Sequence, residues 1–476
     1  MDESTNPTSD LYVDLDGTFS KSDMLFESFV IAIKGNPLII FMCVFWLIQG
    51  KSNLKHELSQ RANIAIELLP LNQEFYSFLI NEKEKNRKII LATSSNEKYA
   101  QGICSNYELF DSYISSDKHT NLKGGAKLSK IQSLSKKFSY AGNSSEDFIL
   151  FEQAESSYLV NPTRKAKRMA LTAVPSRIFD NESVGTKTWL KQLRVQQWLK
   201  NALIFVPLLV SGSFVNSNLV FLSLLGFISF SCLASGTYII NDLLDLDADR
   251  NHKRKKLRPL ASGKISIINA IIVAAILFFF AFGLTSVLDG LFVFVLAGYL
   301  ILTLIYSFKI KQYIGLDVIT LATLYTVRIF AGAVILDVPV SFWLFAFSMF
   351  IFLSLALIKR CAELKSFEGQ NKTYAIGRDY SVLDYSVLMN LGTSSAMLSV
   401  LMFCFYVNSN ILTDQYQQPT LLWLIVPALC YWLMRMWIKM HRGEMHDDPI
   451  VFSLKDKGSL ITIGFIGLIA LLAQLL

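Results

Sequence analysis

The sequence predicts an α/β domain over residues 1–180, followed by an all-α membrane domain over residues 181–476. Apolar runs long enough to cross a bilayer recur from about residue 200 onward. The first part has 21 Lys or Arg and 21 Asp or Glu, whereas the second part has 24 against 17 and so carries the net charge of +7. With 52% hydrophobic and 17% charged residues, the chain is too apolar for an ordinary soluble protein and too charged to lie wholly in lipid.

Several classes of protein are disfavoured by composition. The six cysteines are scattered, without a Cys-x-x-Cys pair or a histidine at ligand spacing, which argues against a zinc site or a disulfide framework. The positive charge belongs to the membrane part, so it does not indicate nucleic-acid binding. The N-terminal segment MDESTNPTSD has acidic residues and no apolar region, so we expect no secretory signal and a cytoplasmic first domain.

In the first domain, the segment LYVDLDGTFSKSD at residues 11–23 predicts a buried strand that ends in acidic side chains, Asp14 and Asp16. The carboxyl ends of strands form the binding crevice of α/β sheets. Three later segments add polar groups: KIILATSSN at 88–96, a strand that ends in hydroxyls; NLKGGAKLSKI at 121–131, with two lysines at a helix start; and FSYAGNSSEDFIL at 138–150, a strand before Asn143 and Asp147.

These motifs, in this order, resemble the haloacid dehalogenase phosphohydrolases over about residues 10–175, and the resemblance implies a Rossmann-like fold. It implies that Asp14 is the nucleophile that takes the phosphoryl group and that Asp16 is the general acid and base. It also implies that Thr93 binds the phosphoryl oxygens and that Lys127 balances their charge.

The resemblance further implies a Mg²⁺ site, formed by Asp14 and Asp16 and completed by Asn143 with Asp147. Asn143 stands where the family usually has Asp, which removes one charge but keeps an oxygen ligand. Lys123 competes with Lys127, which is preferred because it begins the apolar-periodic stretch KLSKIQSL.

One apolar run of the first domain, PLIIFMCVFWLI at residues 37–48, is too short to span a bilayer. Lys34 and Lys51 flank it. We expect this run to enter the membrane interface, where it would hold the soluble domain against the membrane. The alternative is a buried helix of that domain.

The second part contains nine apolar runs that predict a bundle of nine transmembrane helices, the first of them short. The runs lie near residues 201–215, 219–240, 267–287, 291–307, 317–336, 341–358, 387–407, 421–438 and 459–476.

The connections between these helices differ in charge. Alternate connections, SGSFVNSN, VLDGL, LDVPV and VNSNILTDQYQQPT, contain no Lys or Arg, and the others contain nearly all of them. By the positive-inside rule, the charged connections and the first domain face the cytoplasm, and the C-terminus lies outside. We therefore expect a multi-pass protein of the inner or plasma membrane with a cytoplasmic N-terminal domain.

The connection after the second predicted helix includes residues 241–258, the charged segment, in which four Asp precede six Lys or Arg. On a continuous helix Asp242, Asp245 and Asp249 lie within roughly 60° of one another. Three carboxylates on one face repel each other unless a cation lies between them, and Mg²⁺ binds carboxylate oxygens together with substrate phosphates.

Basic residues of the charged segment can complete such a site, because Arg250, Lys255 and Arg258 can contact phosphate oxygens that the metal leaves free. The pattern therefore predicts a diphosphate site. The alternative is a solvated loop whose basic residues only fix topology and contact anionic lipid, and we prefer it for Lys253 and Lys256.

The motif N-D-x-x-D-x-x-x-D, which begins at Asn241 in the charged segment, resembles the first metal motif of the UbiA superfamily of intramembrane prenyltransferases. The resemblance covers the whole membrane part and implies a UbiA-like bundle. Members of that superfamily bind an allylic diphosphate through Mg²⁺ and transfer the prenyl group to an aromatic acceptor.

Most such enzymes carry a second D-x-x-x-D, where this chain has Asp317 but Leu321 in place of the partner. The segments YSFKIKQYIGLDVITLATLYTVRIFAGA, LRVQQWLKN, KRCAEL and DDPIVFSLKD instead resemble the polyprenyl-phosphate phosphoribosyltransferase branch, although Val195 replaces the usual Pro. In that branch the diphosphate belongs to phosphoribosyl pyrophosphate, and the lipid phosphate is the nucleophile.

A lipid phosphate that approaches from the bilayer needs cations at the cytoplasmic ends of the helices. Five cationic residues lie at such ends: Lys200, Lys309, Lys311, Lys359 and Arg360. Glu363 is one helical turn from Lys359 and Arg360, as an ion-pair partner for these two.

Arg328 lies eleven residues after Asp317 on a predicted helix, about 20° round the axis and deep in an apolar stretch. Intramembrane arginines usually face a cavity or a partner. Two roles are open, a phosphate ligand or a structural partner of Asp317 or of backbone carbonyls.

These patterns favour a bifunctional enzyme with Mg²⁺ as its cofactor. The membrane part would transfer phosphoribosyl from phosphoribosyl pyrophosphate to a polyprenyl phosphate, and the first domain would remove the 5-phosphate to give polyprenyl-phosphoryl ribose. Prenyl transfer to an aromatic acceptor is a second hypothesis, and a lipid-phosphate transporter or binding module with a regulatory phosphatase domain is a third. The expected partners are the membrane and these two substrates, without nucleic acid; the oligomeric state is open.

Overall fold

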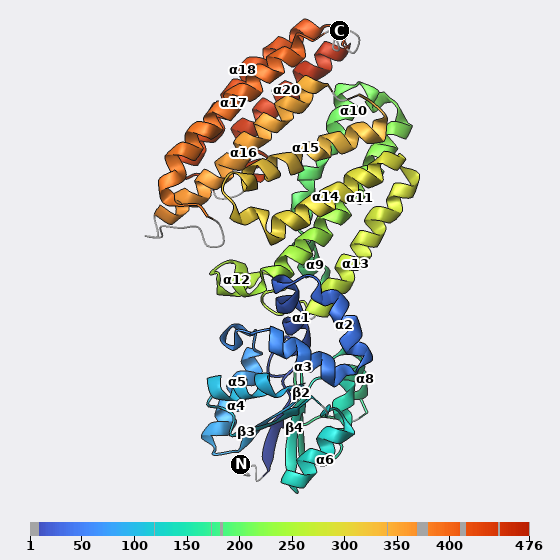
Figure 1. The fold of residues 1–476 in the computed structure, drawn as a ribbon, viewed down its shortest axis with the longest axis vertical. Helices are drawn as coiled ribbons and strands as arrows, with labels where there is room; N and C mark the ends of the chain where they lie inside the picture. The colour runs from blue at the N-terminus through green and yellow to red at the C-terminus, as the bar shows by residue number, and fades with distance from the viewer. Residues whose placement is uncertain are drawn as a thin grey trace. The chain divides into compact units, whose positions relative to one another are not determined.

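The computed structural model describes residues 9–118, 120–172, 174–180, 184–339, 341–368, 379–409, 416–445 and 448–475. The chain forms two compact units (Figure 1). The N-terminal unit comprises Met1–Leu193 together with Ile239–Val273, and the helical unit comprises Arg194–Tyr238 and Ala274–Leu476. The charged segment therefore packs with the N-terminal unit, although in the sequence it lies between two membrane helices.

The N-terminal unit is built on a six-stranded parallel sheet with the strand order β3-β2-β1-β4-β5-β6. The strands are β1 (Asp10–Val13), β2 (Ile89–Asn96), β3 (Ser112–Ser116), β4 (Phe138–Gly142), β5 (Ser156–Val160) and β6 (Arg177–Phe179). Val13 at the end of β1 is paired with Leu91 of β2 and Ala141 of β4. Because parallel strands end at the same edge, the residues that follow β1 and β4 meet those at the end of β2.

Helices cover both faces of this sheet. On one face, α4 (Gln73–Glu84) and α5 (Glu97–Asn106) pack with Leu11 and Val13. On the other face, α6 (Gly125–Leu134), α7 (Phe148–Phe151) and α8 (Arg164–Met169) pack with Tyr12. Successive residues of β1 thus point to opposite faces, as the two-residue period of a strand requires. The predicted α/β class of the first domain is confirmed.

An insert of three helices separates β1 from β2: α1 (Met24–Gly35), α2 (Ile39–Ile48) and α3 (Lys51–Arg61). Ile39 and Trp46 of α2 are buried with Ala32 of α1 and Leu58 of α3. The apolar run at 37–48 is therefore a helix with one buried face, and its contact with a membrane stays a prediction.

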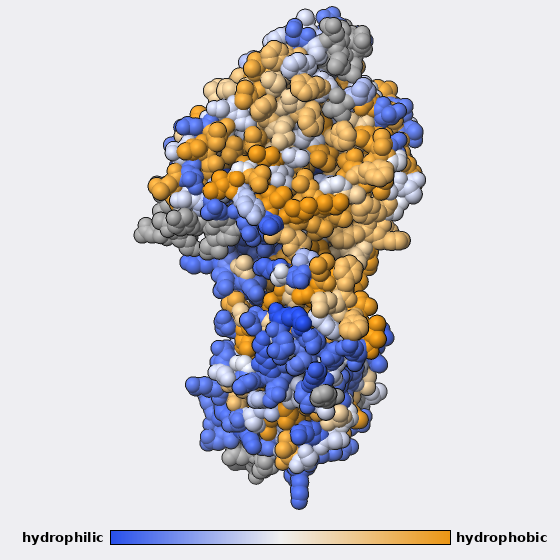
Figure 2. Space-filling model, in the orientation of Figure 1, coloured by the Kyte–Doolittle hydropathy of each residue, from blue (hydrophilic) through white to orange (hydrophobic). Residues whose placement is uncertain are grey.

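Eight helices of the described chain are long and apolar enough to cross a membrane. They are α11 (Ser217–Leu244), α13 (Ile267–Gly283) with the 3₁₀ turn that follows it, α14 (Gly290–Phe308), α15 (Leu316–Leu336), α16 (Phe342–Glu368), α17 (Tyr385–Val407), α18 (Ile425–His441) with the 3₁₀ turn before it, and α20 (Lys457–Leu475). Large apolar side chains such as Phe279 and Phe294 point outward, and the visible surface of the helical unit is mostly hydrophobic (Figure 2). Such a surface suits lipid as its solvent.

The first predicted span is shorter and less regular than the others. It consists of a 3₁₀ helix, Val195–Phe205, and α10 (Val206–Val210), which has Pro207 in its first turn. The predicted count of nine spans is not confirmed, and the side on which each connection lies stays a prediction. Residues 369–378 and 410–415, which belong to two of the connections used for that prediction, lie outside the described residues.

Candidate active sites

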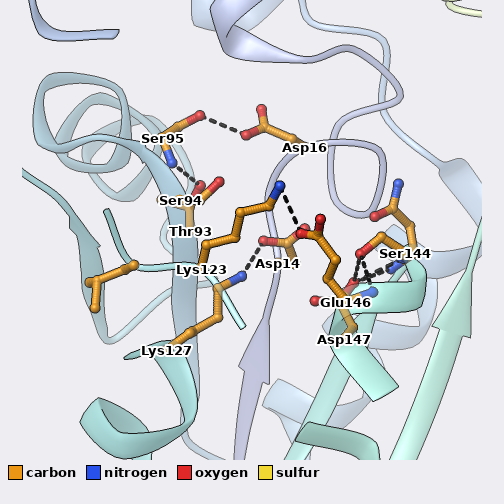
Figure 3. A network of polar contacts seen from close by, with 12 residues as sticks. Asp14, Asp16, Thr93, Ser94, Ser95, Lys123, Lys127, Ser144, Glu146 and Asp147 are labelled. Carbon is orange, nitrogen blue, oxygen red and sulfur yellow. Dashed lines mark hydrogen bonds and ion pairs between the residues drawn. The ribbon is translucent and has the colours of Figure 1, made fainter. Parts of the chain in front are cut away.

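The carboxyl end of β1 brings the predicted nucleophile and its cation together. Asp14 directly follows β1, and Nζ of Lys127, from the first turn of α6, lies 2.8 Å from Asp14 Oδ1 (Figure 3). Lys127 also donates to the hydroxyl of Tyr140 at 3.0 Å. Burial raises the pKa of Asp14 to about 7, although the charge of Lys127 opposes this change.

Asp16 lies in the turn after β1 and is held from two sides. Its Oδ2 accepts a hydrogen bond from Ser95 Oγ at 2.6 Å, and its Oδ1 accepts one from the N–H of Met24 at 2.8 Å. The N–H of Ser95 donates to Thr93 Oγ1 at 2.9 Å, so the end of β2 fixes both hydroxyl groups. Burial and the charge of Asp23 raise the pKa of Asp16 to about 7, which suits a group that must give and take a proton near neutral pH.

Asn143 and Asp147 follow β4 at the same edge. Asp147 Oδ2 accepts hydrogen bonds from the N–H groups of Asn143 and Ser144, at 3.2 and 2.9 Å, and so closes the turn. The side chain of Asn143 lies against Gly17, where an added Cβ would be only 1.9 Å from Asn143 Nδ2. Gly17 also has φ of +78°, so both its conformation and this contact require glycine.

These oxygen atoms suit a divalent cation. Asp14 is buried and Asp16 half-buried, and loss of solvation is the main cause that raises the pKa of both carboxyl groups. Hard cations bind carboxylate and amide oxygens, which Asp14, Asp16 and Asn143 supply. Within the described part of the chain, no three Asp, Glu, His or Cys side chains form a ready-made metal cluster. The identity of the ion and the part taken by Asp147 therefore stay predictions.

Two further lysines lie near this site. Lys123 pairs with Glu146 at 2.8 Å, and both side chains are about half exposed, so Lys127 is the lysine that contacts Asp14. Lys55 of α3 donates to the backbone oxygen of Ser94 at 2.6 Å, beside Thr93. Lys55 was not predicted as a site residue, because no sequence motif links the helical insert to the ends of the strands.

In the charged segment, two predicted metal ligands share an arginine. Arg258 Nη1 lies 3.1 Å from Asp242 Oδ1 and also pairs with Asp249. Gln192 donates to the other oxygen of Asp242 at 2.9 Å. Two carboxylates that converge on one positive charge suit a cation, and here the guanidinium group provides that charge.

The prediction of a continuous helix through the three aspartates is wrong. α11 ends at Leu244, and α12 (Leu246–Asn251) begins after Asp245. The N–H of Asp245 still donates to the carbonyl of Asn241 at 3.0 Å, so the interruption is short. Asp242 and Asp249 are buried, whereas Asp245 is half-buried.

Arg250 lies in a different place from the one predicted. Its guanidinium group is 4% exposed and pairs with Glu27 of α1 at 2.6 Å, so it does not face the carboxylates of Asp242 and Asp249. This corrects its predicted contact with phosphate. Lys255 is about half exposed, and its Nζ lies 3.9 Å from Asp249.

In the helical unit, Lys200 and Lys359 meet at one carboxylate. Asp448 Oδ2 lies 2.7 Å from Lys200 Nζ and 3.4 Å from Lys359 Nζ. Lys200 Nζ also lies 5.6 Å from the centre of the Tyr325 ring. Tyr325, Lys359 and Asp448 line a small pocket. Lys200 and Lys359 are two of the predicted cations. Asp448, which lies in the segment DDPIVFSLKD, was not predicted as a site residue.

Asp317 and Arg360 form a fully buried ion pair, with 2.8 Å between Asp317 Oδ2 and Arg360 Nη2. Tyr380 donates its hydroxyl to Asp317, and Glu363 pairs with Arg360 as predicted. Arg360, a predicted phosphate cation, is thus the partner of Asp317. Both charges are balanced inside the helical unit.

Arg328 has polar partners other than Asp317. It donates to Asn201 Oδ1 and to the hydroxyl of Tyr299, each at 2.8 Å, and to the carbonyl of Leu324. Of the two roles left open for Arg328, phosphate ligand or structural partner, these contacts match the structural one. The partners are backbone and side-chain oxygens. Lys309 and Lys311 lie in the connection between α14 and α15, with Lys309 exposed.

Comparison with known proteins identifies the membrane part. The UbiA prenyltransferase family matches residues 202–460. The uncharacterized protein y4nM of Sinorhizobium fredii is 35% identical over 465 residues, which cover 96% of this chain and 90% of that protein. The match to y4nM runs through both parts of the chain.

Two further similarities concern the membrane part. Decaprenyl-phosphate phosphoribosyltransferase of Mycobacterium tuberculosis is 33% identical over 205 residues, which cover 39% of this chain and 66% of that enzyme. A solved UbiA homolog from Archaeoglobus fulgidus, bound to GPP and Mg²⁺, aligns with a TM-score of 0.48 at 18% identity, over 60% of this chain and 99% of that one. With its apolar helices and its matched family, the chain is an integral membrane protein that belongs to the UbiA prenyltransferase family, and a parallel α/β domain precedes its membrane helices.

Proposed function

We propose that the chain is a bifunctional membrane enzyme that makes polyprenyl-phosphoryl ribose in two steps. In the first step, the bond between ribose C1 and the diphosphate of phosphoribosyl pyrophosphate breaks, and C1 bonds to an oxygen of polyprenyl phosphate. In the second step, the N-terminal domain hydrolyses the 5-phosphate of that lipid. Both sites would lie on the cytoplasmic side, so the first product stays in the membrane beside the phosphatase.

The observation that carries the choice of donor is the buried pair of Asp317 and Arg360. Aromatic prenyltransferases of the superfamily use a second acidic motif for the metal-bound diphosphate, and here its one remaining aspartate is neutralised by an arginine. Breaking such a buried pair is costly, since it leaves an unpaired charge. This supports a single acidic donor site, and the similarity to decaprenyl-phosphate phosphoribosyltransferase supports phosphoribosyl as the group transferred.

The charged segment would bind the donor. Asp242 and Asp249 would exchange Arg258 for a divalent cation, with Asp245 and Asn241 beside them, and Arg258 would then pair with a diphosphate oxygen. A cation held there would neutralise the negative charge that develops on the leaving diphosphate. No protein nucleophile is needed, because the lipid phosphate attacks C1.

Lys200 and Lys359 would hold the attacking lipid phosphate. Their ammonium groups converge on Asp448, which keeps two like charges close together until an anion arrives. Asp448 would act as a positioning residue, since it orients both lysines without reaching the reacting atoms.

For the second step, Asp14 beside Lys127 would be the nucleophile with its cation, and Asp16 would be the group for proton transfer. Asp14 would attack the phosphorus atom, Asp16 would protonate the leaving ribose oxygen, and water would then release phosphate from Asp14. Thr93 would donate to a phosphoryl oxygen.

Purified protein tests both halves in one experiment. Wild type, Asp14→Asn and Asp245→Ala are incubated with Mg²⁺, polyprenyl phosphate and phosphoribosyl pyrophosphate labelled in the ribose. We expect labelled lipid without 5-phosphate from wild type, the phosphorylated lipid from Asp14→Asn, and neither from Asp245→Ala.

Absence of labelled lipid with all three proteins would overturn the first half of the proposal. Phosphorylated lipid as the end product of wild type would overturn the second half. The alternative, prenyl transfer to an aromatic acceptor, has support from the 38% identity over 115 residues to 4-hydroxybenzoate octaprenyltransferase of Shewanella oneidensis. Transfer of labelled prenyl to 4-hydroxybenzoate in the same preparation would favour it.

A further inference from the structure

The outer surface of α2 is apolar along its whole length. Phe41 is 73% exposed, Phe45 60% and Ile48 80%, and α2 contains no charged residue. Other large exposed apolar residues of the α/β domain, such as Leu134 and Leu171, do not follow one another along the chain as those of α2 do. In Figure 2 the surface at α2 is hydrophobic, whereas much of the N-terminal unit is hydrophilic. Contiguous apolar surface of this kind usually marks an interaction site.

The inner face holds α2 firmly in this orientation. Ile39 and Trp46 are buried against α1 and α3, and the guanidinium group of Arg61 lies 4.6 Å from the centre of the Trp46 ring. α2 therefore exposes Phe41 and Phe45 because its other face is already packed.

Charge around α2 favours a negatively charged partner. Between Glu27 and Glu57 the chain has no Asp or Glu. Lys34 and Lys51 flank α2 and are both exposed. An apolar helix with lysines at its ends suits the interface of an anionic bilayer, which takes up the apolar side chains and attracts the lysines.

The insert also reaches the phosphatase site. α3 follows α2 directly and carries Lys55, whose Nζ donates to the carbonyl of Ser94 at 2.6 Å. The next residue, Ser95, holds Asp16. The same three-helix insert thus has an apolar outer surface and a cation at the catalytic strand end.

We propose that α2 lies in the headgroup region of the bilayer, with Phe41, Phe45 and Ile48 at the boundary with the acyl chains, and that it thereby directs the phosphatase site to phosphate esters carried by membrane lipids. The partner is the anionic lipid surface, within reach because the same chain spans the membrane. The substrate half of this inference rests on the proposed phosphatase function, and the docking half does not.

The docking half is tested by fluorescence quenching. An environment-sensitive fluorescent amino acid replaces Phe41, Phe45 or, as a control of similar exposure, Leu134 in the full-length protein. Each protein is reconstituted into phosphatidylcholine vesicles, with or without phosphatidylglycerol, that contain lipids with a nitroxide near the headgroup. We expect positions 41 and 45 to lose most of their fluorescence, more so with the anionic lipid, and position 134 to lose little. Equal quenching at all three positions would overturn docking, whatever the activity.

The substrate half is tested with the variant Phe41→Asp with Phe45→Asp. We expect its kcat/KM for the phosphoribosyl lipid in vesicles to fall about tenfold or more, because charged side chains are poorly accepted at that depth. Its kcat/KM for p-nitrophenyl phosphate should not change, and Leu134→Asp should change neither value. An equal fall for both substrates, or no fall for either, would overturn the selective role of α2. Absence of phosphatase activity in wild type would instead remove the proposed function and leave the quenching result intact.

Discussion

Acidic side chains follow an apolar segment at two places in the N-terminal unit, after β1 and after α11, and the two sites balance their charge differently. After β1, Asp14 has Lys127 at 2.8 Å, yet both Asp14 and Asp16 have raised pKa values. After α11, Asp242 and Asp249 share Arg258. After β1 a lysine from a separate helix faces one carboxylate, whereas after α11 an arginine of the same loop pairs with two.

The difference arises from how the chain supplies each cation. Lys127 comes from a helix of the sheet domain, 113 residues from Asp14, so its distance is set by packing. Arg258 is only nine residues from Asp249 and belongs to the same charged segment. Under the proposed function, a metal and a diphosphate would displace Arg258 from the two carboxylates, and binding there would be an exchange of ions. Four experiments test whether the two sites differ in this way.

The largest expected effect is that of Lys127→Met on dephosphorylation. Loss of the cation that faces Asp14 should lower kcat about 10³-fold, since a preorganised charge contributes most in a buried site. Transferase activity should be unchanged. Lys123→Met and Lys130→Met, on the same segment but exposed, should stay near wild type. A large loss with Lys123→Met and a small one with Lys127→Met would reverse the assignment.

The next effect concerns the stability of the N-terminal unit. Glu27→Gln leaves the buried charge of Arg250 unpaired and should lower the free energy of unfolding by about 3 kcal/mol. Glu57→Gln breaks the exposed pair with Arg61 and should cost less than about 1 kcal/mol. Hydrogen exchange of α1 and β1 amides in full-length protein measures both. Similar values for the two variants would show that the pair of Glu27 and Arg250 is well hydrated.

A third effect is a pH dependence of the metal-free protein. Asp14 and Asp16 have folded pKa values of about 7, above the ordinary 3.8, so the folded domain holds protons that the unfolded chain releases. Stability should therefore fall as pH rises from about 4 to 7, by at most about 1.4 kcal/mol per pH unit for each group. Thermal unfolding of the N-terminal unit in EDTA measures this. Added Mg²⁺, or Asp14→Asn with Asp16→Asn, should flatten the curve; a curve that rises with pH would contradict the assignment.

The smallest effect tests ion exchange at the charged segment. Arg258→Ala should lower the metal concentration that gives half-maximal transferase activity, because Asp242 and Asp249 no longer pair with an arginine. It should also raise the KM for the diphosphate donor about tenfold, because one charge-assisted contact is lost. Arg254→Ala, an exposed neighbour, should change neither value. If both constants moved in the same direction, Arg258 would have only one of the two roles.

The sequence predicted which polar residues lie together at this edge of the sheet, because carboxyl ends of parallel strands meet wherever the strand order allows. Asp14, Thr93 and Asn143 follow or end three such strands, and a strand's apolar residues and the polar residues after it are visible in the sequence. Lys127 could be chosen over Lys123 because the sequence pattern indicates that a helix begins there.

Contacts between distant segments were not predictable in this way. Arg250 is 223 residues from Glu27, and Arg328 is 127 residues from Asn201. Charge alone suggested phosphate for Arg250, yet burial against α1 assigns it an internal partner. Asp448 was not predicted for the same reason. No pattern in its own segment indicates that two lysines from distant segments pair with it.

Residues 239–273 pack with the N-terminal unit, although in the sequence they lie between two segments of the helical unit. These residues belong to the stretch that the UbiA family matches, yet their buried arginine, Arg250, pairs with Glu27 of the α/β domain. A chain that began at residue 194 would keep all eight described helices that are long enough to cross a membrane. Arg250 of the charged segment would lose its partner, Glu27. The family-matched part of this chain therefore takes part of its packing from the preceding domain, and we expect the two parts to separate only with a loss of stability.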